Sequence, residues 1–270
     1  LKGIQTICCQ PLDTVFKLFS ILTEEYVSIV LVCVVYWLIN KRVGVYMCYS
    51  LTTSLLLNNT LKNIFLRPRP IGVEGVRSIY TDTATGTSFP SGHSQSVSSM
   101  YISMARGFNK KWLYILTAAI ALLCGFSRLY LGVHWPSDVI AGLLLGTAAA
   151  FLAPYAMDSK HKHIITFATA VIGTVLCLFI EDKSLVTAAG LSTGFAVGML
   201  LEEKYVRFST DIPIKKKILR FLVGVVIVAV VYLAPKFILP SLPIIRYLRY
   251  AALALCAAYA APLVFIKLKI

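Results

Sequence analysis

The residues of this chain that could do chemistry lie in three short blocks. The blocks read Lys62-(six residues)-Arg69-Pro70, Pro90-Ser91-Gly92-His93 and Ser127-Arg128-(five residues)-His134-(three residues)-Asp138. Together they contain two histidines, three cations and a carboxylate within a chain that is otherwise mostly apolar. We therefore look for the function of the protein in this region.

The cations Lys62, Arg69 and Arg128 predict a phosphate site. Each lies at the end of an apolar run, on one face of the predicted bundle, and the three would repel one another unless a polyanion neutralised them. An Arg fork binds two phosphate oxygens at once and a Lys adds a point charge, so one cluster can hold the non-bridging oxygens of a phosphate. These loops contain no carboxylate cluster for divalent metals, so we expect neither a metal nor a cofactor.

Ser91, Gly92 and His93 lie where the next apolar run begins. The first N–H groups of a helix and its positive dipole end favour an anion, and Gly lets the backbone approach a ligand closely. The ring of His93, one residue further in, would lie beside the phosphate and could protonate a leaving oxygen. We predict that Ser91 and Gly92 bind phosphate and that His93 is the general acid.

His134 and Asp138 have the spacing of neighbours on a helix face, although Pro136 between them indicates that the helix begins after His134. If Asp138 accepts a hydrogen bond from one ring nitrogen, the lone pair of the other nitrogen is free to attack phosphorus. This pair therefore has the pattern of a nucleophile with the group that orients it.

The composition indicates a membrane protein. Hydrophobic residues make up 58% of the 270 residues and charged residues 14%, which is too apolar for a soluble domain. The apolar runs have the length of membrane-spanning helices rather than of barrel strands, so we predict an all-α, polytopic transmembrane bundle. The net charge of +14 comes from basic residues between the runs and not from a basic-aromatic patch, which argues against nucleic acid.

The apolar runs predict about nine spans after an interfacial helix over residues 1–22. The predicted spans are Tyr26–Asn40, Val43–Ile64, Ser91–Ala105, Trp112–Tyr130, Ser137–Met157, Ile164–Ile180, Leu185–Leu201, Ile218–Leu239 and Ile244–Ile266. Small residues such as Gly142 and Gly146 favour close packing in the fifth span. If the spans alternate, most basic loops face the cytoplasm and the three blocks face away from it.

In order and spacing, the three blocks resemble the signature of the type-2 phosphatidic acid phosphatase family, within the superfamily that includes vanadium haloperoxidases and bacterial acid phosphatases. The similarity covers roughly residues 51–145. It implies a six-helix catalytic core, metal-free hydrolysis, a phosphohistidine on His134 partnered by Asp138, and acid and then base catalysis by His93. It also implies a phosphate cradle, made of Lys62, Arg69, Arg128, Ser91 and Gly92. The family spacing selects Arg69 over Arg67, which is left as a helper.

This resemblance divides the chain into an N-terminal helix (1–22), a catalytic core (23–157) and additional transmembrane helices (158–270). The expected function is hydrolysis of a lipid phosphomonoester or diphosphate at the extracytoplasmic face of a cell membrane. Phosphotransfer to another lipid, haloperoxidase chemistry and a non-enzymatic lipid carrier or scaffold are the alternatives.

The sequence leaves the lipid open among polyprenyl diphosphate, phosphatidate, phosphatidylglycerophosphate and sphingoid-base phosphate. A span count above six resembles sphingosine-phosphate phosphatases. The loop Ser88–Ser94 is more similar to bacterial enzymes, so we expect a bacterial protein.

Overall fold

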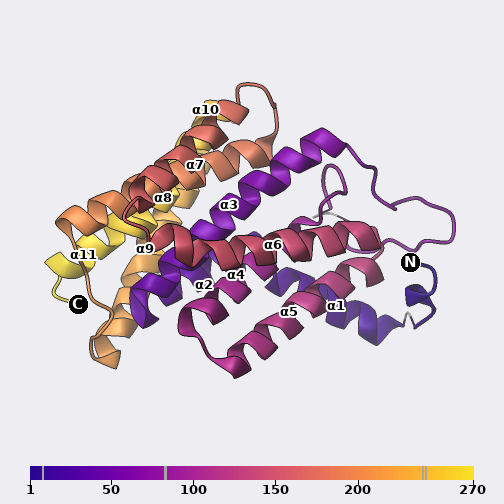
Figure 1. Cartoon of the computed structure of the whole chain (residues 1–270), viewed down its shortest axis with the longest axis horizontal. Coiled ribbons are helices and arrows are strands. Elements are labelled where there is room, and N and C mark those ends of the chain that lie inside the picture. Colours follow the sequence, from indigo (N-terminus) through magenta and orange to yellow (C-terminus); the bar gives the residue numbers. More distant parts are fainter. Residues whose placement is uncertain (8, 82–83, 239, 241) are drawn as a thin grey trace.

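The computed structural model describes residues 1–7, 9–81, 84–238, 240 and 242–270, and every regular element in these ranges is a helix (Figure 1). The predicted all-α class is confirmed. In chain order the elements are η1 (Ile4–Ile7), α1 (Gln10–Leu22), α2 (Glu25–Val34), η2 (Val35–Ile39), α3 (Lys41–Phe65), α4 (Gly92–Phe108), α5 (Lys111–Tyr130), α6 (Pro136–Met157), α7 (Lys162–Leu176), α8 (Lys183–Tyr205), α9 (Ile214–Ile238), α10 (Pro243–Leu255), η3 (Cys256–Ala260) and α11 (Ala261–Lys267).

Each predicted span corresponds to one helix or to two or three consecutive helical segments. Within the described ranges, five helices are long and apolar enough to cross a membrane: α5, α6, α8, residues Ile214–Ala234 of α9, and the continuous run Pro243–Lys267. Val27–Ile39 and Lys162–Leu176 are apolar but shorter. The predicted end of one span, Leu239, lies outside the described residues. The chain is thus a membrane protein with several candidate spans.

The predicted spans α3 and α4 do not belong to this apolar set, because their buried faces are polar. The buried polar residues of these two helices include Ser50, Ser54, Asn58, Asn59, Ser94, Gln95, Ser98, Ser99 and Ser103. Helix α4 packs against α3, α5 and α6, so that these groups find partners inside the bundle. For example, Ser50 Oγ donates to Ser99 O at 3.0 Å and Gln95 Nε2 donates to Ser54 O at 2.9 Å. Buried polar groups hydrogen-bonded in this way are compatible with a membrane interior.

Two glycines of α6 let this helix approach α4, as the sequence predicted. A Cβ atom at Gly142 would lie 2.6 Å from Ser91 O, and one at Gly146 would overlap Ser98 Oγ and Gln95 O. This close contact brings the N-terminus of α6, which carries Asp138, beside the N-terminus of α4.

Helix α1 was expected to lie at the membrane interface, but one of its faces packs against α5. Phe16 contacts the rings of Phe126 and Tyr130, with centroids 5.5 and 4.5 Å apart. The Asp13 carboxylate accepts hydrogen bonds from Arg77 at 2.5 and 2.7 Å and from Tyr130 Oη at 2.7 Å. These contacts attach α1 to the loops that carry the predicted site.

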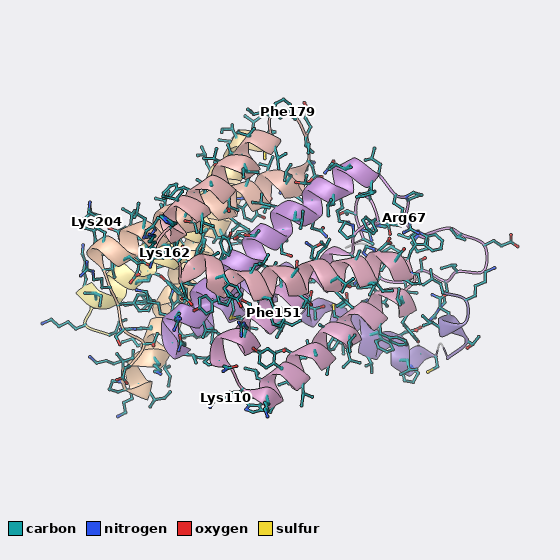
Figure 2. All side chains as sticks on the ribbon, in the orientation of Figure 1. Arg67, Lys110, Phe151, Lys162, Phe179 and Lys204 are labelled. Carbon is teal, nitrogen blue, oxygen red and sulfur yellow. The ribbon has the colours of Figure 1, made fainter. Side chains whose placement is uncertain are left out.

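The basic loops lie at the end of the bundle opposite the three blocks. In Figure 2, Lys162 and Lys204 are at one end of the long axis and Arg67 is at the other. Ion pairs tie these loops together: Arg42 with Asp158 at 2.7 Å, and Lys162 with Glu203 at 2.7 Å. The charge distribution along the bundle is therefore strongly asymmetric.

Candidate active site

A polar cavity of about 720 Å³ lies where α3 ends and α4 begins, at the end of the bundle that carries Arg67 in Figure 2. It is lined by most of the predicted site residues: Lys62, Arg69, Gly92, His93, Arg128 and His134. The fold thus brings together side chains that are up to 72 positions apart in the sequence, from Lys62 to His134. Asp138 and Ser91 lie behind this lining.

The guanidinium of Arg69 is held by backbone carbonyls of two loops. Nε donates to Gly86 O at 3.0 Å, Nη2 to Thr85 O at 2.8 Å and Nη1 to Val133 O at 3.0 Å. Burial, with a further contribution from the charge of Arg128, lowers the pKa of Arg69 to about 10. The group therefore stays cationic at neutral pH in a fixed orientation, as an anion site requires.

Lys62 and Arg128 bring two more cations to the cavity. Lys62 Nζ donates to Thr87 O at 2.6 Å. Arg128 is fully buried, and its Nη1 donates to Ser20 Oγ of α1. The Nε of Arg128 is also buried, and no group in the described part of the chain accepts its proton. Unsatisfied buried donors are costly, so this cradle fits an anionic group that would accept from them.

His134 and Asp138 lie close together, as their spacing predicted, and the hydroxyl of Ser88 lies beside them and contacts both. His134 Nδ1 is 3.6 Å from Asp138 Oδ2. Ser88 Oγ is 3.3 Å from Nδ1 and donates to Asp138 Oδ2 at 2.5 Å. Ser88 therefore provides a hydrogen-bonded relay from His134 to Asp138 beside their direct contact.

The neighbours of the ring determine its tautomer. Nε2 of His134 lies 2.9 Å from Arg69 Nη1, and because a guanidinium can only donate, Nε2 is the acceptor. The ring proton is then on Nδ1, directed at Ser88 Oγ. Burial is the main cause that lowers the pKa of His134 to about 3, and the charge of Arg69 adds to the effect. The imidazole is neutral at pH 7, with the lone pair of Nε2 on the cavity side.

The carboxylate of Asp138 also accepts hydrogen bonds from groups other than Ser88. Its Oδ1 accepts from Arg67 Nη1 at 2.9 Å, and its Oδ2 accepts from the backbone N–H of Trp135 at 2.9 Å. Arg67 also donates to Ser137 Oγ at 2.6 Å, and its guanidinium lies over the Trp135 ring. The two arginines of the Arg67-Pro68-Arg69 segment thus have separate contacts: Arg67 pairs with the Asp138 carboxylate, whereas Arg69 faces the cavity.

The structure corrects the predicted placement of Ser91. Its N–H, expected to be free for an anion, donates to Asp138 O at 2.9 Å, and its Oγ accepts from Ser94 Oγ at 3.0 Å. Ser91 does not reach the cavity because this contact joins the first turns of α4 and α6. Gly92 and His93, one and two residues later, do line it.

His93 Nε2 is buried, and among the described residues it has no hydrogen-bond partner. The side chain of Asn58 on α3 donates to Pro90 O at 3.3 Å and to Gln95 Oε1 at 2.8 Å. It thereby joins α3 to both sides of the segment that carries His93.

Within the described residues, no group of three His, Cys, Asp or Glu side chains is arranged to hold a metal ion.

Comparison with known proteins agrees with this geometry. A profile described as the PAP2 superfamily matches residues 43–162, and a second, described as the transmembrane extension of PAP2 superfamily phosphatases, matches residues 186–270. The chain contains a PAP2 superfamily domain followed by a PAP2 transmembrane extension. Its relatives are phosphatases of lipid phosphates and diphosphates.

Two curated relatives and one solved structure illustrate the similarity. Undecaprenyl-diphosphatase of Sulfolobus acidocaldarius is 34% identical over 42% of this chain and 54% of its own length. Phosphatidylglycerophosphatase B of Bacillus subtilis is 36% identical over 44% of this chain and 60% of its own length. The crystal structure of Aquifex aeolicus LpxE superposes with a TM-score of 0.52 at 25% identity, over 56% of this chain and 90% of that one. The match thus spans less than two thirds of either curated relative.

The far wall of the cavity, which sequence reasoning missed, comes from the start of α8, the residues just before it, and α10. This wall contains Glu181, Asp182, Lys183, Ser184, Thr187, Ala188, Arg246 and Tyr250, of which the last four lie in the PAP2 transmembrane extension. None of these residues belongs to a recognisable motif, and only the packing of α8 against α3 and of α10 against α8 brings them to the site.

Proposed function

We propose that this PAP2 protein hydrolyses the phosphomonoester or diphosphate bond of a membrane lipid through a phosphohistidine on His134. The observation that carries the proposal is the neutral His134 ring, whose Nε2 faces three cations while its Nδ1–H is oriented by Ser88 and Asp138. A nucleophile, its orienting group and a phosphate cradle are the parts that this reaction needs.

In the first step, Nε2 of His134 attacks phosphorus and the bond from phosphorus to the leaving oxygen breaks. His93 donates a proton to that oxygen, and the lipid alcohol or lipid monophosphate departs. In the second step, His93 accepts a proton from water, the oxygen of the water attacks phosphorus, and the phosphorus–nitrogen bond breaks to release inorganic phosphate. Lys62, Arg69 and Arg128 stabilise the charge on the non-bridging oxygens in both steps.

The relatives support a lipid substrate, and their names cover polyprenyl diphosphate, phosphatidylglycerophosphate, sphingosine-1-phosphate and lipid A. We propose a substrate of this chemical class, a site on the extracytoplasmic face of the membrane, and catalysis without a metal. We also propose that residues 23–157 are the catalytic core, that 158–270 are an addition to it, and that the N-terminal helix (1–22) is attached to the core through the Ser20–Arg128 contact.

A rapid-quench measurement with nitrophenyl phosphate tests the roles of the two histidines. His134→Ala removes the attacking nitrogen and should show neither a burst nor turnover. His93→Ala should still release a burst of nitrophenolate, since this leaving group needs little protonation, and should then stall because water attack lacks its base. General acid–base help of this kind amounts to roughly 10²- to 10⁴-fold. A burst from His134→Ala and none from His93→Ala would mean that the roles are reversed.

Release of inorganic phosphate from a purified lipid phosphate in detergent, with no acceptor present, tests hydrolysis against phosphotransfer. Lipid binding or transport that His134→Ala leaves intact, with no phosphate release by the wild type, would identify a carrier instead.

Phosphatase activity should persist in excess EDTA and should be inhibited by vanadate. Loss of activity in EDTA, with recovery when magnesium is added, would contradict metal-independent catalysis.

A further inference from the structure

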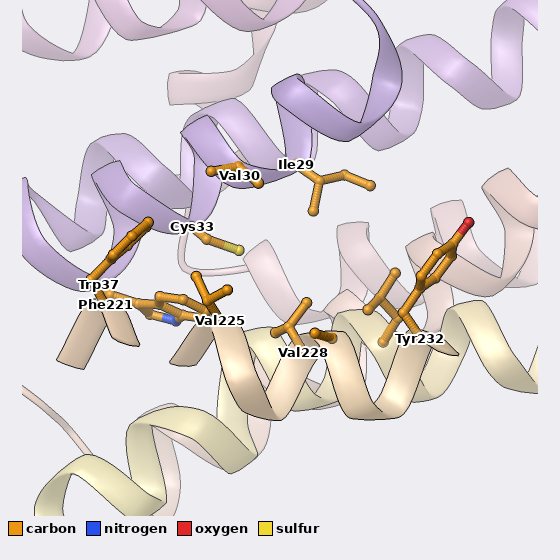
Figure 3. A pocket seen from close by; sticks show the side chains of 10 residues that line it. Ile29, Val30, Cys33, Trp37, Phe221, Val225, Val228 and Tyr232 are labelled. Carbon is orange, nitrogen blue, oxygen red and sulfur yellow. The ribbon is translucent and has the colours of Figure 1, made fainter. Parts of the chain in front are cut away.

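An apolar groove of about 180 Å³ lies between α2 and α9 (Figure 3). Ile29 and Cys33 on α2 face Val225 and Val228 on α9 across the open space in Figure 3. One wall of the groove belongs to the first helices of the chain and the other to the PAP2 transmembrane extension.

A small apolar cavity lies between the groove and the catalytic cavity and shares lining side chains with both. A second apolar cavity, of about 80 Å³, is lined by Ile29 and Cys33, which also line the groove. It is lined as well by Leu51 and Leu55 of α3, which also line the catalytic cavity. The three spaces therefore follow one another along common walls.

A second link joins the groove to the site. Tyr250 lines the catalytic cavity and Tyr232 lines the groove, and their rings are in edge contact with centroids 6.1 Å apart. Along α9 the groove extends from Tyr232 to Phe221, which is about 16 Å at the rise of an α-helix. Trp37 lies at the end of the groove away from Tyr232 (Figure 3).

The groove is firmly held at that far end. Tyr36 Oη donates to Ala258 O at 3.0 Å and Trp37 Nε1 donates to Ala257 O at 2.8 Å. A Cβ atom at Gly224 of α9 would lie 2.5 Å from the Trp37 ring, so the ring is packed directly on that helix. These contacts fix the spacing of α2 and the extension, and the groove between them is a built feature.

The change in polarity from the catalytic cavity to the groove matches that of a molecule with a charged head and an apolar tail. The catalytic cavity carries Lys62, Arg69 and Arg128, whereas the groove and the small cavity are lined almost entirely by apolar side chains. A phosphate joined to a hydrocarbon chain has the same change from charge to apolar surface. We propose that the groove between α2 and α9 binds the hydrocarbon tail of the lipid whose phosphate lies in the catalytic cavity. This assignment rests on the proposed function, and it makes tail recognition a role of the transmembrane extension.

A groove-filling substitution tests the assignment by chain length. Val228→Trp places a large ring in the groove, and Val226→Trp is the matched control because Val226 is 61% exposed and does not line the groove. The substrates are hexadecyl phosphate and butyl phosphate in detergent. Val228→Trp should lower kcat/KM for hexadecyl phosphate by roughly tenfold, the effect of losing the burial of about two methylene groups. Butyl phosphate and the control should be unaffected.

Two outcomes would overturn the proposal. An equal fold-loss on both substrates would mean that the groove does not distinguish a long tail from a short one, and unchanged activity on both would place the tail elsewhere. If the wild-type protein releases phosphate from neither lipid, then the proposed function has failed, and the position of the tail is tested separately by photolabelling.

The photolabelling probe is a non-hydrolysable hexadecyl phosphonate that carries a diazirine in the middle of its chain. Labelled peptides from α2 and α9, reduced by Val228→Trp but not by Val226→Trp, support the groove as the tail site. Labels confined to other helices would overturn it. Equal labelling of the groove by a photoreactive phosphatidylcholine, without competition from the phosphonate, would show that the groove holds bilayer lipid only and would overturn the proposal as well.

Discussion

At the scale of single residues, the site depends on side chains that hold the reacting groups in place. Ser88 connects His134 with Asp138, Arg67 neutralises the outer oxygen of Asp138, and Ser20 holds Arg128. Since Arg69 occupies the acceptor nitrogen of His134, an incoming phosphate would take over this guanidinium and leave the lone pair of Nε2 facing phosphorus.

The contact through Ser88 leads to the first prediction. Ser88→Ala removes the hydroxyl between Nδ1 and the carboxylate, so the ring loses its orientation and the positive charge that develops on it loses its stabilisation. A hydrogen bond to a charged group is worth about 1.5–3 kcal/mol, so kcat should fall about 10- to 100-fold. Steady-state kinetics should show little change in KM. Ser98→Ala, which removes another buried hydroxyl of the same bundle, should retain wild-type activity, and equal rates for the two variants would exclude the relay.

The buried imidazole also predicts a dependence of stability on pH. Burial lowers the pKa of His134 to about 3, whereas an unfolded histidine has a pKa of about 6.5. Between these values the unfolded chain binds a proton that the folded protein does not, so the free energy of unfolding falls as the pH decreases below about 6.5. Thermal unfolding in detergent at about pH 7 and pH 5 should show this loss.

Variants identify the residue responsible for this pH dependence. His134→Gln should show a smaller decrease in melting temperature between the two pH values, because one of the protons taken up on unfolding is gone. The control is His161→Gln, which removes an exposed histidine and should leave the decrease unchanged. An unchanged slope in His134→Gln would show that this ring is already protonated in the folded protein.

At the scale of helices, α4 and α6 position the site by starting side by side. Ser91 N–H donates to Asp138 O, and the glycine face of α6 lies against Ser98 and Gln95. Asp138 also closes the first turn of α6 through the Trp135 N–H. A change in the distance between these two helices would therefore move His93 and the Ser88–Asp138 relay at once.

Gly146→Leu tests this coupling between packing and catalysis. The new side chain would overlap Ser98 Oγ and Gln95 O, and overpacking of a tight core costs about 1–3 kcal/mol. We expect a lower melting temperature and reduced kcat, measured on the protein in detergent. Leu144→Ile, on the exposed face of the same helix where Leu144 is 66% exposed, should leave both unchanged. Wild-type stability of Gly146→Leu would mean that α6 can shift without affecting α4.

At the scale of the whole molecule, the two ends of the bundle differ in the groups that they carry. One end holds the cavity, and the other carries the basic loops with Lys162 and Lys204 (Figure 2). Basic loops that have no ligand to bind are explained by retention on the cytoplasmic side. The cations of the cavity are instead explained by the phosphate they would hold, which is consistent with a site on the outer face.

Accessibility of single cysteines tests this orientation. In a background with the native cysteines replaced by alanine, Glu74→Cys in the exposed loop between α3 and α4 should react with an impermeant thiol reagent added to intact cells. Lys216→Cys, exposed at the basic end, should react only after the membrane is opened. The reverse pattern would place the catalytic cavity in the cytoplasm.

The sequence alone determined the helical class and the asymmetry of charge, and it indicated the candidate reacting groups that we propose. Helical spans could be predicted because apolar runs are a local property of the chain, and His134, His93 and the three cations because their types and spacing suit phosphoryl transfer. The tertiary structure decided how these groups are held. Ser88 is 46 residues from His134 and Ser20 is 108 residues from Arg128, so neither contact leaves a trace in local spacing.

The same reason explains where sequence reasoning was wrong. Ser91 has the position of an anion-binding residue at a helix start, but the adjacent start of α6 takes its N–H. The spacing of His134 and Asp138 predicted that they lie close together, but it did not predict the Ser88 hydroxyl that contacts both of them. The groove between α2 and α9 likewise joins segments about 190 residues apart. Such features depend on which helix ends and faces meet, and this is settled by packing across the whole bundle.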